Sequence, residues 1–81
     1  MHTGHRASLG NMKPGQHGRI TGLSHMDAAL VHKLMALGVL PGETVVVLQT
    51  SPAYVVKIGY TQVALDYLLA QAVEVEPVSD F

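Results

Sequence analysis

The segment "HKLMALGVLPGETVVVL", residues 32–48, contains the end of a helix, a turn and the start of a strand. Gly38 stands where a left-handed glycine commonly follows a helix, and Pro41 just beyond it stops the helix from continuing. Pro41 and Gly42 then turn the chain into Thr44–Leu48, a run of aliphatic and β-branched residues that favours a strand. This strand is apolar on both faces. A strand at the surface of a small domain usually alternates apolar and polar residues, so the second apolar face of this strand must be covered by something.

The residues before this turn predict an α-helix near residues 26–37. Its apolar residues recur in steps of four, four and three, which places them on one helical face. These residues are Met26, Leu30, Leu34 and Leu37. Ser24 followed by Asp27 resembles a capping box, and Asp27 can itself be the N-cap. We expect this face to pack into the core.

The residues after the strand predict a hairpin, "VVKIGYTQVAL" at 55–65, with a two-residue loop at Gly59 and Tyr60. Glycine at the first loop position suits a tight hairpin turn. A two-residue loop fixes the register, and alternation then places three facing pairs on one side of the hairpin. The pairs are Ile58 with Thr61, Val56 with Val63, and Tyr54 with Leu65. We expect this side to be core and the side with Lys57 to face solvent.

The remaining segments complete a small antiparallel fold. Residues 17–23 suggest a first strand broken at Gly22, residues 66–71 a short helical turn, and the alternating "VEVE" at 73–76 a last strand. Apart from the helix, the connections are too short for parallel crossovers. We therefore predict a mainly β chain, a strongly bent barrel of about five strands with one inserted helix. Residues 1–8 are expected to be a mobile N-terminal segment, 9–77 the domain and 78–81 a tail.

Composition limits the kinds of function. The chain has 81 residues, enough for one domain, and its formal net charge is −1. This charge gives no reason to expect nucleic acid as a partner. No segment approaches the ~20 apolar residues of a membrane span, and the N-terminus has no signal-peptide pattern. We expect a cytoplasmic protein without membrane insertion.

Neither catalytic motifs nor a metal site stand out. The sequence has no nucleophile-elbow or phosphate-loop motif, so we expect no enzyme activity. Two of the five histidines, His25 and His32, lie seven residues apart on the predicted helix, about 10 Å along its axis and too far to share one ion. His2 and His5 could bind a divalent metal weakly, iron(II) included. We expect no confident metal site and no cofactor.

Three stretches together resemble the FeoA family. They are "LGNMKPGQHGRI" (9–20), "LMALGVLPGETVVV" (34–47) and "VVKIGYTQVALDYLLAQAVEV" (55–75). The resemblance implies an SH3-like barrel and a non-enzymatic accessory role in bacterial ferrous iron uptake. It also implies a partner, the membrane transporter FeoB, whose cytosolic part is a GTP-hydrolysing domain. Because the same module ends some iron- and manganese-dependent repressors, a regulatory module of metal-dependent transcription is the alternative, and direct divalent-metal binding is another.

The chain departs from the family pattern at two places. The stretch at residues 50–53 is shorter than in many relatives, and Asp66 stands where many carry arginine. If either place touches the partner, the likeness carries over less well there.

The second face of the apolar strand has three candidate covers. The helix could pack over it and make Val46 and Leu48 core residues, a partner protein could bind there, or a second copy could do so as a homo-oligomer. The predicted partner-contact residues lie on the helix flank, the turn and the strand. They are Val31, Met35, Leu37, Gly38, Leu40, Pro41, Gly42, Val46 and Leu48.

Overall fold

Six strands and two α-helices make up the computed structural model, which describes residues 7–23 and 27–78. The strands are β1 (Ala7–Ser8), β2 (His17–Leu23), β3 (Thr44–Gln49), β4 (Tyr54–Ile58), β5 (Thr61–Leu65) and β6 (Val73–Pro77). The helices are α1 (Ala28–Ala36) and α2 (Tyr67–Ala72), and a 3-10 turn, η1, spans Leu9–Asn11. The prediction of a mainly β chain with an inserted helix is confirmed.

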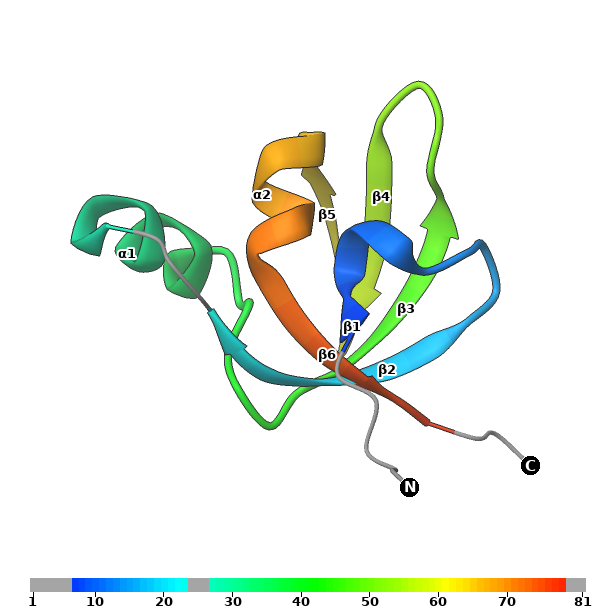
Figure 1. Cartoon of the computed structure of the whole chain (residues 1–81), viewed down its shortest axis with the longest axis horizontal. Coiled ribbons are helices and arrows are strands. Elements are labelled where there is room, and N and C mark those ends of the chain that lie inside the picture. Colours follow the sequence, from blue (N-terminus) through cyan, green and yellow to red (C-terminus); the bar gives the residue numbers. More distant parts are fainter. Residues whose placement is uncertain (1–6, 24–26, 79–81) are drawn as a thin grey trace.

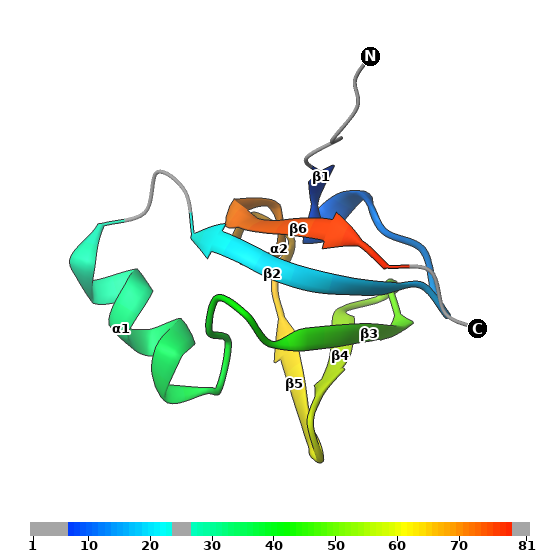
Figure 2. The same cartoon turned by 90° about the horizontal axis from the view of Figure 1, so that it is seen from below.

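The strands form one antiparallel sheet in the order β1-β6-β2-β3-β4-β5. The sheet bends strongly, as Figures 1 and 2 show. Its edge strands β1 and β5 are not paired with each other, so the sheet does not close into a complete barrel. The predicted count of about five strands misses β1, whose two residues are too few to give a period-two pattern.

The hairpin of β4 and β5 has the predicted register. Its paired residues are Ile58↔Thr61, Val56↔Val63 and Tyr54↔Leu65, and Gly59 has a positive φ of 63° in the turn. All of these paired side chains are buried except Thr61, which lies next to the exposed tip. The two-residue loop therefore set the pairing as alternation requires.

Inward-facing side chains from every long strand fill the core. Val45 and Val47 of β3 are fully buried, and Ile20 of β2 and Val75 of β6 lie opposite each other on the inner face. Strand β2 continues through Gly22, where the sequence suggests a break, and only its pairing with β6 shifts register, between Ile20 and Gly22. The inner face of β3 is thus part of the core, whereas its outer face, with Val46 and Leu48, lies outside the core.

Helix α1 begins where the sequence indicates. The Asp27 carboxylate accepts a hydrogen bond of 3.0 Å from the Leu30 backbone N–H, which makes Asp27 the N-cap. Gly38 follows the helix with φ of 94°, the left-handed conformation that glycine adopts without strain. Met26 and the alternative cap Ser24 lie outside the described residues.

The prediction that the helix buries its whole apolar face is wrong. Only Leu34 of α1 is buried, whereas Leu30 and Leu37 remain 38% and 39% exposed. In Figures 1 and 2, α1 lies to one side of the sheet and does not cross it. A helix that touches a sheet along one line buries only the residues on that line, however wide its apolar stripe is.

Short elements lie between the two sheet edges. Ala7 and Ser8 pair with Val75 and Glu74, two residues before the expected start of the domain. Helix α2 packs beside η1 (Figure 1), and Asp66 caps it by accepting a 2.8 Å hydrogen bond from the Leu69 N–H.

In the described part of the chain, neither helix has the length and apolar character of a membrane span.

Candidate partner-contact surfaces

The outer face of β3 is apolar and reaches the surface. Val46 lies opposite His17 of β2 and Lys57 of β4, and it is half-buried. Leu48 is 41% exposed. On the neighbouring strand, Val55 lies on the same side as Lys57 and is also half-buried. We call Val46, Leu48 and Val55 the sheet surface. Since Leu48 remains exposed, α1 does not turn this face into core.

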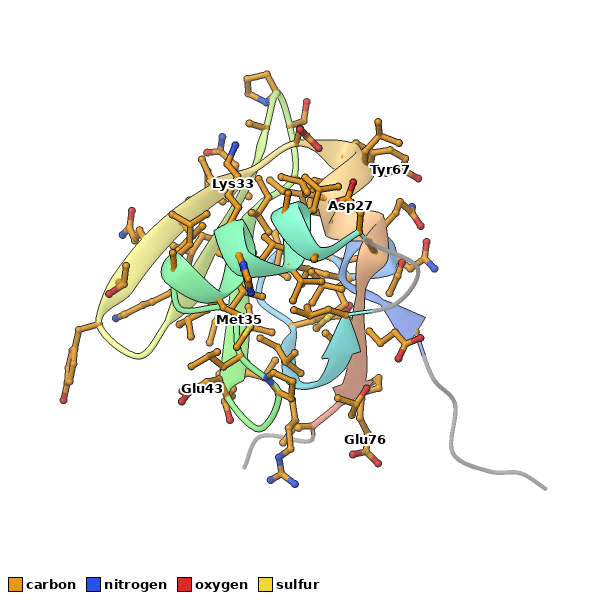
Figure 3. All side chains as sticks on the ribbon, turned by 90° about the vertical axis from the view of Figure 1, so that its left-hand side faces the viewer. Asp27, Lys33, Met35, Glu43, Tyr67 and Glu76 are labelled. Atoms are coloured by element: carbon orange, nitrogen blue, oxygen red, sulfur yellow. The ribbon has the colours of Figure 1, made fainter. Side chains whose placement is uncertain are left out.

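Helix α1 carries a second apolar surface. Leu34, the buried residue, lies in the middle of an apolar arc that is about 160° wide at 100° per residue. The residues to either side of Leu34 stay half-buried or exposed. They are Leu30, Val31, Met35 and Leu37, which we call the helix surface. Figure 3 shows Met35 and Lys33 on opposite sides of α1. Lys33 therefore lies outside the apolar arc, on the polar side of the helix.

The turn after α1 is held to the sheet by its backbone. Gly42 donates a 2.7 Å hydrogen bond to the Ile20 carbonyl, and the Ile20 N–H donates one of 2.9 Å to the Glu43 carbonyl. Gly42 needs its left-handed φ of 97° for this path. Val39 is buried beneath the turn, whereas Leu40 is half-buried and Pro41 exposed. Gly38 and Gly42 therefore shape the turn, and Leu40 and Pro41 are its side chains at the surface.

The predicted contact residues do not form one patch. Leu48 lies four residues beyond Thr44, about 13 Å along β3 from the end that follows the turn. The turn follows α1 directly, so Leu40 and Pro41 lie near the helix surface in the sequence. Leu48 lies toward the far end of β3, away from this turn. The structure thus separates the helix surface from the sheet surface.

Other exposed apolar side chains lie outside the predicted partner-contact residues. Tyr60 at the hairpin tip is fully exposed, and Leu68 and Tyr67 at the start of α2 are 80% and 58% exposed. The hairpin register correctly placed Val55 on the solvent-facing side with Lys57, but Val55 was not among the predicted partner-contact residues. The signal for Val55 was its position two residues before Lys57 in an alternating strand.

The histidines do not assemble a metal site in the part of the chain that is described. Within residues 7–23 and 27–78, no three side chains of the His, Cys, Asp and Glu types come together to hold an ion. His32 is exposed on α1, and His17 lies on β2 beside Val46. His2, His5 and His25 lie outside the described residues, so weak metal binding by His2 and His5 stays a prediction.

Solved structures show the same fold in iron-related proteins. An iron uptake regulatory protein (FeoA) is similar over 91% of this chain and 99% of its own, with 26% identity and a TM-score of 0.84. FeoA of Stenotrophomonas maltophilia, a prokaryotic SH3-domain protein solved with zinc, covers 85% of this chain and 88% of its own at 24% identity and a TM-score of 0.75. This likeness confirms the SH3-like fold.

A manganese-dependent transcriptional repressor contains the same fold. It matches 96% of this chain with 21% identity and a TM-score of 0.83, but the match spans only 45% of the repressor. At this identity the likeness concerns the fold alone. No curated protein matches the chain.

One family model covers nearly the whole sequence. It is described as the FeoA domain, and it matches residues 7–77, from the first strand to the end of the last. The match includes both candidate surfaces and the turn between α1 and β3. The chain therefore belongs to the FeoA domain family, which is implicated in ferrous iron transport.

Proposed function

We propose that the chain is a non-enzymatic, cytoplasmic accessory protein of bacterial ferrous iron uptake, acting through contact with a FeoB-type transporter. One observation carries the proposal, namely that a FeoA-family fold leaves apolar side chains exposed on two surfaces. Apolar groups gathered at the surface of a small protein commonly mark binding sites for other proteins. The S. maltophilia relative, described as a candidate activating factor of ferrous iron transport, supports the same role.

Contact explains the chain better than iron carriage does. Of the five acidic residues in the described part of the chain, Asp27 and Asp66 cap helices, and Glu76 lies opposite Arg19 across two strands. A carrier needs several oxygen or nitrogen ligands around one ion. A regulator that binds a transporter's cytosolic GTPase domain needs only a fitting surface.

The test is an NMR titration of the isotope-labelled chain with the purified cytosolic GTPase domain of the FeoB from the same organism. We expect amide shifts confined to one of the two apolar surfaces, with GTP hydrolysis by the chain alone absent. Lack of any shift at several hundred micromolar GTPase domain, together with lack of co-purification with the full transporter, contradicts the proposal.

A regulatory role in metal-dependent transcription is the second candidate. It is favoured by the match of 96% of this chain to part of a manganese-dependent transcriptional repressor. The two roles differ in a deletion strain. Loss of ferrous iron uptake with unchanged transcription of iron-responsive genes supports the accessory role. Altered transcription that precedes any change in uptake supports the regulatory one.

A further inference from the structure

Positively charged residues border the sheet surface. Lys57 lies directly opposite Val46, and Arg19 lies opposite Thr44, two residues before Val46 on the same side of β3. Lys13 belongs to the turn before β2. The backbone of this turn pairs with Val47 along the edge of β3 that is opposite β4. There the Gly15 N–H donates to the Val47 carbonyl at 2.8 Å, and the Val47 N–H donates to the Gln16 carbonyl at 3.0 Å.

The charges are distributed unevenly over the molecule. Lys13, Arg19 and Lys57 are three of the four Lys and Arg residues within 7–23 and 27–78, and only Lys33 lies elsewhere, on α1. Among the same residues, the outward positions of β2 to β5 include no Asp or Glu. The described acidic residues lie at the helix caps, in the turn before β3 and on β6. They are Asp27, Asp66, Glu43, Glu74 and Glu76.

We propose that the sheet surface is the docking site for an acidic segment of the protein partner, one that also presents apolar side chains. This inference rests on the proposed function and adds the face and the chemistry of the contact. The partner's apolar groups cover Val46, Leu48 and Val55, and its carboxylates face Lys57 and Lys13. An apolar centre with a charged rim of complementary sign is the usual arrangement of a transient protein interface.

A protein fits this face better than a membrane or a nucleic acid does. Polybasic membrane-binding segments gather four to eight cations, and nucleic-acid sites also depend on many phosphate contacts. The sheet surface has three cations around an apolar centre, and Arg19 already lies opposite Glu76. The chain as a whole has a net charge of −1.

Two matched pairs of variants test the site. Lys57→Glu and Lys33→Glu each reverse one exposed lysine, so they change the net charge equally, on the sheet surface and on α1 respectively. Leu48→Ser and Leu30→Ser each remove a leucine of similar exposure, 41% and 38%. Unfolding curves for all four variants verify that each one is folded.

The first measurement is the Kd for the cytosolic GTPase domain of the transporter, by calorimetry at two salt concentrations. We expect Lys57→Glu and Leu48→Ser to weaken binding about tenfold, and Lys33→Glu and Leu30→Ser to change it less than about twofold. Binding of the wild type should also weaken as salt rises. Equal affinity of all four variants and the wild type overturns the assignment to the sheet surface but leaves the proposed function standing.

Two further probes separate failure of this site from failure of the proposed function. If the wild type binds neither the GTPase domain nor the full transporter, the proposed function fails, and a synthetic peptide of alternating Glu and Val tests the surface by itself. Salt-sensitive amide shifts at Val46 and Lys57, lost in Lys57→Glu, support the site. Their absence overturns it. The second probe is vesicles of phosphatidylserine and phosphatidylcholine. If the wild type sediments with these vesicles and Lys57→Glu does not, the result overturns a protein partner in favour of a membrane.

Discussion

At the scale of single residues, Leu34 attaches α1 to the rest of the molecule. It is the only residue of the helix that is fully buried. We predict that Leu34→Ala lowers the free energy of unfolding by about 2–4 kcal/mol, since it leaves a cavity that the neighbours cannot fill. Met35→Ala, on the exposed flank, is the control and should cost less than about 1 kcal/mol. Urea unfolding followed by circular dichroism measures both, and equal losses contradict this role for Leu34.

Asp66 stabilises the start of helix α2. Its carboxylate accepts the Leu69 N–H at 2.8 Å and caps α2. We predict that Asp66→Ala lowers stability by about 1 kcal/mol, because a free N–H at the helix start loses its acceptor. Asp66→Asn keeps an acceptor and should retain most of that stability. If thermal unfolding shows that Asp66→Arg is as stable as the wild type, the cap contributes little.

At the scale of elements, α1 and the sheet differ in how firmly they are held. The strands pair with neighbours and bury alternate side chains, whereas α1 has one buried residue and an exposed flank on either side of it. We predict that the α1 amides exchange hydrogen well before those of β3 and β4, because opening the helix exposes little apolar area. Hydrogen exchange followed by NMR measures this. Protection of Leu34 and Met35 equal to that of Val56 indicates that α1 opens only with the whole fold.

The same contrast explains what could be predicted from sequence. The hairpin register follows from a two-residue loop and alternation, both of which are local, so the pairing of Val56 with Val63 was predicted correctly. How many residues of α1 are buried depends on where the sheet lies relative to the helix. The apolar arc in the sequence does not contain that information. Leu30 and Leu37 were therefore wrongly expected in the core. An apolar strand on both faces did lead to Val46 and Leu48 as surface candidates. The positive rim of the sheet surface depends on β2 lying beside β3, a pairing that no local pattern contains.

At the scale of the whole molecule, side chains bridge the gap that backbone pairing leaves open. The edge strands β1 and β5 are at opposite ends of the sheet order, and η1 and α2 lie between them. Tyr54, at the start of β4, donates its hydroxyl to the Gly10 carbonyl of η1, and its ring lies 6.1 Å from that of Tyr67 in α2. On the β1 side, Ser8 Oγ donates a 3.1 Å hydrogen bond to Gln71 of α2.

If Tyr54 joins the two ends of the sheet, removing its hydroxyl should affect distant residues. We predict that Tyr54→Phe lowers the free energy of unfolding by about 1–2 kcal/mol, because the Gly10 carbonyl loses its partner while the ring still fills the core. Amide exchange should rise in η1 and β1, which lie far from Tyr54 in sequence, and should change little in β2 and β3. The matched control is Tyr60→Phe at the exposed hairpin tip, which should leave stability unchanged. An increase confined to β4 and β5 contradicts a bridging role, because the hydroxyl would then stabilise only its own hairpin.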